Sequence, residues 1–326
     1  MLLIGDIGGT KTNLAIFTTD GSLQLQRQTI YKSADYASLE AIVQEFLANS
    51  PNDISKAVFG VAGPVVNGES HITNLPWHIT ESGLKDVLDT PLVKLLNDLE
   101  AIAYAVPHLS DQDLELLNPQ QANPIAGHKA IIAPGTGLGE ALLVYQNGTY
   151  QAIASEGGHS DFAPTTLFEI ELLKYLLGKH NHVSYERVCS GGLGIPNIYA
   201  YLKENHYEKE PPHITEALKN TADPTPVIIQ AALKEECDLC LATLNAFVKI
   251  LGSEAGNLAL KAMAIGGIYL GGGIPPRILP KLTDGTFMAA FVKKGRFSDT
   301  LSHIPVYVIL NQQSALLGAA HYALRL

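Results

Sequence analysis

Apolar runs and amphipathic patterns alternate along the chain and predict a mixed α/β fold. Residues 2–17 consist of two apolar stretches that flank a polar, glycine-rich turn, which is the pattern of a β-hairpin. Residues 131–145 repeat this plan around a Gly-Thr-Gly turn. Because repeated supersecondary units indicate repeated architecture, the two hairpins predict two similar halves.

Further strands and helices follow in alternation. The apolar runs predict strands at residues 23–31, 56–62, 91–96, 268–273 and 305–310. Helical periodicity is present at 36–49, 81–88, 167–177, 226–262 (a helix pair or one interrupted helix) and 314–324, the last with Ser314 as its cap. We expect loops at 65–77, 111–126, 155–160 and 184–192. The alternation indicates a mainly parallel sheet after an antiparallel hairpin, with ligands at the carboxyl ends of strands.

Length and composition favour two ordered domains. The chain has 326 residues, of which 46% are hydrophobic, so it can bury a full core. We expect a small α/β domain from residues 1–108 plus 300–326 and a large α/β domain from 109–299. The net charge of −10 and the scattered Lys and Arg residues argue against a nucleic-acid partner. No apolar run is long enough for a membrane helix, and no cationic leader is present, so we expect a cytoplasmic protein.

The three cysteines do not form a metal or disulfide motif. Cys237 and Cys240 form a C-x-x-C, but their surroundings have helical periodicity and no second Cys or His pair lies at metal spacing. We therefore expect a structural role. An odd number of cysteines also fits a reducing compartment.

The first hairpin has the composition of a phosphate site. Gly8 and Gly9 can adopt backbone angles that direct consecutive N–H groups into one anion-holding concavity. Asp6 precedes them, and a carboxylate is compatible with phosphate only when a cation such as Mg²⁺ stands between the two. An ordinary hairpin whose Asp makes a turn is an equal alternative for this stretch alone. The second Gly-Thr loop favours a polyphosphate held from both sides.

Eight motifs in a fixed order make the chain resemble the bacterial glucokinases of the hexokinase, Hsp70 and actin ATPase superfamily. They are GDIGGTKT at 5–12, TNLPW at 73–77, LLNDLEA at 95–101, APGTGLG at 133–139, SEGGHSDFAP at 155–164, YERVCSG at 185–191, LGGGIPPR at 270–277 and LLGAA at 316–320. The resemblance spans nearly the whole chain. It implies two ribonuclease-H-like (actin-type ATPase) domains that face a central cleft, ATP and Mg²⁺ as cofactors, and a homodimer.

The resemblance also assigns roles to individual residues. Asp98 is implied as the general base toward the sugar 6-hydroxyl, a role that suits a carboxylate because the attacking hydroxyl must lose its proton. The implied sugar-binding residues are Asn74, Asn97, Asp98, Glu156, His159 and Glu186. The implied nucleotide-binding residues are Gly5, Asp6, Ile7, Gly8, Gly9, Thr10, Lys11, Gly135, Thr136, Gly137, Gly271, Gly272 and Gly273, with Asp6 also as the metal residue.

Each assignment has a plainer alternative. Asp98 and Asn74 are residue types common in turns, His159 could be a structural or metal-binding histidine, and the glycines at 271–273 could serve packing. Asn13 stands where related glucokinases often have Arg, which leaves open whether Lys11 supplies the positive charge near the phosphates.

The function expected from the resemblance is transfer of the ATP γ-phosphate to the 6-hydroxyl of D-glucose. A ROK-type kinase of another hexose or of an amino sugar is the alternative within the enzyme class, but the cysteine-rich zinc motif of that family does not follow His159. A sugar- or nucleotide-responsive regulator without enzymatic activity is the alternative from another class. Polyphosphate stays open as the phosphoryl donor.

Overall fold

The computed structural model describes residues 1–19, 22–48, 53–72, 75–119 and 125–326. The chain divides into two compact units: Met1–Ser110, Tyr150–Ala154 and Asn311–Leu326 form the first, and Asp111–Thr149 and Ser155–Leu310 form the second. The boundary that we expected at residue 300 differs from this division. Residues 300–310 belong to the second unit, where the strand Val306–Ile309 pairs in parallel with Ile268–Leu270.

The first unit contains a five-stranded sheet in the order β3-β2-β1-β4-β7. Its strands are β1 (Leu2–Ile7), β2 (Lys11–Thr18), β3 (Gln24–Lys32), β4 (Lys56–Val61) and β7 (Val93–Asn97). β1 and β2 form the predicted antiparallel hairpin, whereas β4 runs parallel to β1 and β7 runs parallel to β4. The expected antiparallel hairpin followed by parallel strands is confirmed, and the carboxyl end of β7 is residue Asn97.

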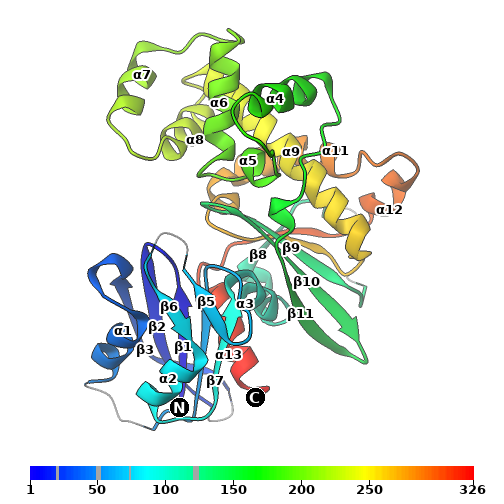
Figure 1. Cartoon of the computed structure of the whole chain (residues 1–326). Helices are drawn as coiled ribbons and strands as arrows, with labels where there is room; N and C mark the ends of the chain where they lie inside the picture. Colours follow the sequence, from blue (N-terminus) through cyan, green and yellow to red (C-terminus); the bar gives the residue numbers. More distant parts are fainter. Residues whose placement is uncertain (20–21, 49–52, 73–74, 120–124) are drawn as a thin grey trace. The chain divides into compact units, whose positions relative to one another are not determined.

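Two pairs of helices accompany this sheet (Figure 1). They are α1 (Leu39–Leu47), α2 (Glu81–Leu88), α3 (Asp98–Ala105) and α13 (Ser314–Ala323). α1 and α2 contribute buried apolar residues to one core together with Trp77, while α3 and α13 pack against each other and against β4. The side chain of Ser38 caps α1 by accepting from the N–H of Ala41, as expected from a Ser at an N-cap. Ser314 does not cap α13 as we expected, because the cap position is occupied by Gln313.

A six-stranded sheet has the order β11-β10-β9-β12-β13-β8, and all of it except residues Tyr150–Ala154 of β11 belongs to the second unit. Its strands are β8 (Leu114–Leu116), β9 (Lys129–Pro134), β10 (Leu138–Gln146), β11 (Thr149–Ser155), β12 (Ile268–Leu270) and β13 (Val306–Ile309). β9 and β10 form the second predicted hairpin, and β12 runs parallel to β9. Each sheet therefore has a hairpin whose first strand pairs with a parallel strand, which is the repetition that the two motifs predict.

A long central helix, α9 (Asp238–Ala262), organises the helices of the second unit (Figure 1). The others are α4 (Leu167–Leu177), α5 (Glu186–Cys189), α6 (Gly194–Glu204), α7 (Pro212–Lys219), α8 (Thr225–Leu233), α10 (Leu279–Leu282), α11 (Thr286–Phe291) and α12 (Ser298–Ser302). α6, α8 and α11 all contact α9, and the pair α8 and α9 resolves the stretch 226–262 as two helices. Cys237 caps α9 by accepting from the N–H of Cys240 at 3.3 Å. All three cysteines are buried, and the cap made by Cys237 agrees with the structural role expected of the C-x-x-C pair.

Several short elements were missed by the sequence patterns. The segment expected to be a loop at 65–77 contributes β5 (Glu69–His71), which pairs with β6 (His78–Thr80), and the segment 111–126 contributes β8. The expected loop at 184–192 contains the short helix α5. β11, α6 and α7 were also not predicted. β5, β8 and α5 have three or four residues, which are too few to show a period, and the edge strand β8 is defined by its partner β13, which is remote in sequence.

Candidate functional site

The turn of the first hairpin is held by contacts at both of its ends. The N–H of Gly8 donates to the carbonyl of Lys11 at 3.0 Å. Ser33, which lies beyond β3, donates its hydroxyl to the carbonyl of Gly8 at 2.8 Å and its N–H to the carbonyl of Thr10 at 3.1 Å. The sequence contains no signal for this role of Ser33, because only tertiary contacts distinguish it from a loop serine. These are the turn contacts and a buried contact of 3.0 Å between the hydroxyls of Ser33 and Thr12.

Asp6 lies beside this turn in the interior of the sheet. Burial raises the pKa of its carboxyl, and the positive charge of Lys11 opposes that shift. A partly buried carboxylate next to a glycine turn is a suitable oxygen ligand for Mg²⁺, so the residues present fit this ion. The neighbouring Gly5 has a different role, because a Cβ there would lie 2.5 Å from Cδ1 of Phe59. Ile7 is fully buried and belongs to the core.

The second glycine loop, residues 135–137, is hydrogen-bonded to Gly191 and Gly192, which follow α5. The N–H groups of Gly191 and Gly192 donate to the carbonyls of Gly135 and Thr136 at 2.8 and 3.0 Å. A Cβ at Gly192 would lie 2.6 Å from the Thr136 carbonyl oxygen, so only glycine permits this approach. The pair at 191–192 thus supports the predicted phosphate loop. In the sequence, the Gly191-Gly192 dipeptide was the signal from which this support could have been predicted.

The glycines at 271–273 follow β12 and differ in their surroundings. Gly271 donates its N–H to the carbonyl of Ile132 at 3.0 Å. Gly272 has a φ of +81°, and a Cβ there would lie 2.7 Å from the carbonyl oxygen of Pro134. Among the described atoms none lies within 4 Å of a Cβ built on Gly273. Packing alone explains Gly272, whereas Gly273 leaves space at the strand end for a ligand to approach the backbone.

Asn97 and Asp98 lie where β7 ends and α3 begins. The side-chain oxygen of Asn97 caps α3 by accepting from the N–H groups of Leu99 and Glu100 at 3.0 and 3.4 Å, and its amide donates to the Gly63 carbonyl at 3.0 Å. Asp98 accepts from the N–H of Leu99 at 2.9 Å. The resemblance implies that Asn97 binds the sugar. Its capping role leaves one amide N–H for a ligand, because each amide nitrogen carries two.

The second unit brings together Glu156, His159 and Glu186. Nε2 of His159 lies 3.8 Å from the Glu156 carboxylate, and Nδ1 lies 3.6 Å from the Glu186 carboxylate. Glu156 precedes the short 3-10 turn Gly157–His159, His159 is the last residue of this turn, and Glu186 begins α5. These segments meet because the N–H of Tyr185 donates to the carbonyl of Ser160 at 3.0 Å. An imidazole between two carboxylates presents donors and acceptors in one place, as a polyol requires.

A pocket of about 550 Å³ opens beside this cluster. His159 and Glu186 line it together with cationic and imidazole side chains, which are those of Lys179, His180, His182 and Arg187. The side chain of Glu186 is 22% exposed, whereas those of Glu156 and His159 are each 58% exposed. Glu186 is thus the most sheltered member of the cluster, and a ligand that reaches it must enter this pocket.

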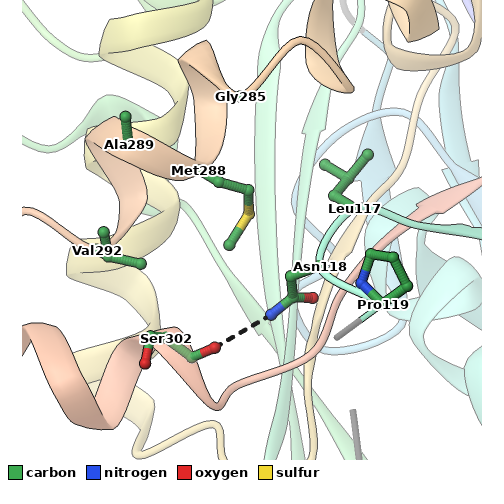
Figure 2. A pocket seen from close by; sticks show the side chains of 8 residues that line it. All are labelled: Leu117, Asn118, Pro119, Gly285, Met288, Ala289, Val292 and Ser302. Carbon is green, nitrogen blue, oxygen red and sulfur yellow. Dashed lines mark hydrogen bonds between the residues drawn. The ribbon is translucent and has the colours of Figure 1, made fainter. Parts of the chain in front are cut away.

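A second pocket, of about 440 Å³, lies between the segment after β8 and helices α11 and α12 (Figure 2). Its walls include the apolar side chains of Leu117, Met288 and Val292. The amide of Asn118 donates to the carbonyls of Ser302 and Ile304 at 3.4 and 2.8 Å. None of the sequence-predicted site residues appears among the described residues that line it, so this pocket is not the expected site.

Three further points concern a predicted sugar contact, metal-binding groups and membrane-spanning helices. Asn74 lies outside the described residues, so its predicted sugar contact is not assessed. Within the described ranges, no group of three or more His, Cys, Asp or Glu side chains could hold a metal ion, and no helix is long and apolar enough to cross a membrane.

Comparison with known proteins identifies the family. A family model described as "Glucokinase" matches residues 3–326. A glucokinase of Nostoc punctiforme is 43% identical and covers 100% of this chain and 99% of its own. The crystal structure of a glucokinase from an Antarctic psychrotroph is 33% identical, with a TM-score of 0.85 and coverage of 100% and 99%.

More distant structures share the fold. A ROK family glucokinase from Streptomyces griseus, in complex with glucose and AMPPNP, is 19% identical, with a TM-score of 0.65 and coverage of 99% of each chain. The match of the family model to nearly every residue and the 43% identical relative agree with the order of the motifs. This chain belongs to the bacterial glucokinase family.

Proposed function

We propose that the protein transfers the γ-phosphate of ATP to the 6-hydroxyl of D-glucose, giving glucose 6-phosphate and ADP. The observation that carries this proposal is the cluster of His159 between Glu156 and Glu186, in a chain that belongs to the glucokinase family. Such a cluster offers fixed acceptors and donors to several hydroxyl groups of one sugar. Sites built to pair hydroxyls discriminate strongly against analogues that lack them.

Asp98 is the proposed general base. The 6-hydroxyl must lose its proton as its oxygen bonds to the γ-phosphorus, and a positioned carboxylate accepts that proton. The contact between Asp98 and the N–H of Leu99, at 2.9 Å, holds one carboxylate oxygen at the start of α3. Asn97 fixes the same helix end through its capping bonds and offers its remaining amide N–H to the sugar.

The two glycine loops and Asp6 are assigned to Mg²⁺-ATP. The N–H groups of Gly9, Thr10, Thr136 and Gly137 suit the phosphates, whereas those of Gly8 and Gly135 close the two turns on the carbonyls of Lys11 and Gly137. Gly271, Gly272 and Gly273 suit the adenosine part. When bound, Mg²⁺ would supply positive charge that stabilises the negative charge developing on the transferred phosphoryl group. Asp6 is the residue that would hold this ion, directly or through water, and Lys11 adds the positive charge at the mouth of the turn.

The arrangement of the whole protein is also part of the proposal. We assign both units to the ribonuclease-H-like type of the hexokinase, Hsp70 and actin superfamily, with the sugar contacted by residues of both. Exclusion of water on closure would prevent phosphoryl transfer to water. A homodimer and a cytoplasmic location stay predictions from the family resemblance.

A ROK-type kinase of another hexose or amino sugar is the second candidate within the class. The Streptomyces griseus ROK glucokinase supports the shared fold only, since it is 19% identical. A non-enzymatic regulator is the candidate from another class. A coupled assay that measures ADP release with glucose, other hexoses and N-acetylated amino sugars, and with ATP or polyphosphate as donor, decides between them. We expect sugar-dependent ADP release that is fastest with glucose. Release that is independent of sugar, or fastest with an amino sugar, would contradict the proposal.

A further inference from the structure

The turn that carries Glu156 and His159 rests on a buried acidic residue that the proposed mechanism does not use. Glu140 lies in β10, three residues after the second glycine loop, and is 2% exposed. A Cβ at Gly157 would overlap Oε2 of Glu140 and would lie 2.9 Å from its Cδ. A Cβ at the adjacent Gly158 would overlap the carbonyl oxygen of Leu138. The two glycines allow the turn to lie directly on β10, with the Glu140 carboxyl beneath it.

This carboxyl lacks the partners that a buried charge requires. Oε1 of Glu140 is buried and has no hydrogen-bond partner within the described part of the chain, where no ion pair to this side chain is found either. A buried carboxylate without a cation or several donors is strongly disfavoured, so the uncharged form is preferred in this position. Glu169, which is 6% exposed, shows the contrast, because Oε2 of Glu169 accepts from the N–H and the hydroxyl of Thr165 at 2.5 and 2.9 Å.

The charged groups that face Glu140 reinforce this preference. On α9, the fully buried Glu254 takes the available donors, namely Nδ2 of Asn257 at 2.8 Å and Nζ of Lys261 at 3.5 Å. On α5, Cys189 is buried, and burial raises the pKa of its thiol well above the usual range. Burial and then the negative charge of Glu254 raise the pKa of Glu140 to about 7, while Lys261 opposes the shift.

We propose that Glu140, with its carboxyl uncharged, is the positioning residue that supports the Glu156–His159 turn for sugar binding. The neutral carboxyl fills the space beneath Gly157 without needing water. Once ionised, it is repelled by Glu254 and is stabilised by hydration, which the packed turn prevents. Water reaches the ionised carboxylate when the turn moves away from β10, and this movement takes Glu156 and His159 away from Glu186. Glucose affinity therefore falls as pH rises through neutrality, whereas nucleotide affinity does not. This inference rests on the proposed sugar-binding role of the turn.

The test is calorimetric measurement of glucose affinity without nucleotide as a function of pH. For the unaltered protein we expect about tenfold weaker binding at about pH 8.5 than at about pH 6, the loss that one pKa unit of coupling would produce. Glu140→Gln is isosteric and permanently uncharged, so it should keep the affinity of low pH across the range. Glu140→Ala removes the support and should weaken glucose at every pH, with ATP affinity retained. Glu169→Gln is the matched control for a buried carboxyl and should follow the unaltered protein.

The outcomes separate the inference from the proposed function. The difference between the pH profiles of Glu140→Gln and the unaltered protein reports on Glu140. Identical profiles for Glu140→Gln and the unaltered protein would overturn the inference. Undiminished glucose affinity in Glu156→Ala would instead overturn the assignment of the turn to the sugar, and with it the proposed site.

Discussion

Gly318 of α13 packs directly on the backbone of α3, because a Cβ at Gly318 would overlap the carbonyl oxygen of Ala101 and would lie 2.6 Å from the N of Ala105. A Cβ at Gly60 of β4 would lie 3.1 Å from Cβ of Ala101. Small residues thus allow α3 to pack closely on both β4 and α13, and Asp98 is the first residue of α3. This contact gives the LLGAA motif at 316–320 a packing role.

Gly318→Ala should therefore displace α3 from α13. We expect a loss of about 1 to 3 kcal/mol in the free energy of unfolding, the usual cost of overpacking, and a lower kcat because Asp98 moves with its helix. Chemical denaturation and a coupled kinase assay measure the two effects. Leu324→Ala, at the 47% exposed Leu324 beyond the end of α13, is the control and should change neither. Unchanged stability and turnover in Gly318→Ala would show that α3 and α13 can move apart without loss of folding free energy or activity.

Asp98→Asn should reduce turnover by at least about 100-fold, the scale of general-base catalysis, while glucose still binds. The amide keeps the size of the side chain and can accept from the N–H of Leu99, but it cannot take the hydroxyl proton. Calorimetry for glucose and a coupled assay separate these effects. Glu100→Gln, two residues later on the same helix, should retain activity. More than half of the normal turnover in Asp98→Asn would remove this residue from the mechanism.

Asp6→Ala should chiefly weaken the use of Mg²⁺-ATP, because the proposed partner of this carboxylate is the metal ion and its waters. We expect a higher KM for Mg²⁺-ATP and a lower kcat, with glucose affinity unchanged when nucleotide is absent. Asp35→Ala is the control, since Asp35 is an exposed acid whose carboxylate lies 3.3 Å from Nζ of Lys32. Loss of glucose binding in a folded Asp6→Ala protein would contradict the assignment of the first hairpin to phosphate.

Glu156→Ala should weaken glucose binding by about 1 to 3 kcal/mol, the cost of leaving a polar partner unpaired, with ATP binding nearly unchanged. If the sugar is contacted from both units, small-angle scattering should also show compaction with glucose, and less of it in the variant at equal glucose. Glu171→Ala, on the exposed side of α4, should behave as the unaltered protein. Glucose that binds without compaction would mean that the sugar site is built from one unit alone.

The buried Glu140 should make stability depend on pH. Its pKa in the folded state is raised from 4.5 to about 7, so the folded state binds more protons than the unfolded state between these values. Its contribution is therefore fully present below about pH 4.5 and is lost as pH rises through about 7. One pKa unit corresponds to about 1.4 kcal/mol, so the total loss is about 3 kcal/mol. Urea denaturation should show Glu140→Gln to be more stable than the unaltered protein at about pH 8, and a Glu140→Gln protein of equal or lower stability would show that the carboxyl is hydrated.

The sequence by itself determined the elements whose signals are local. The β1 and β2 hairpin and its repetition in β9 and β10 follow from apolar runs interrupted by glycine turns. The position of Asp98 after a strand follows from the apolar run at residues 91–96. The order of the eight motifs was sufficient to predict the family that the comparisons show. For each hairpin and for the strand end at Asp98, the physical cause lies within about fifteen residues of chain.

Only the tertiary structure decided which distant residues meet. The contact of Gly318 with Ala101, the bonds of Gly191 and Gly192 to the second glycine loop, and the Glu140 carboxyl beneath Gly157 join segments that no local period connects. Asn97 illustrates the same limit, because its cap on α3 and its bond to Gly63 give it a structural role besides the predicted one. Packing selects these contacts through burial and close approach of backbone, and both depend on the fold as a whole rather than on residue type.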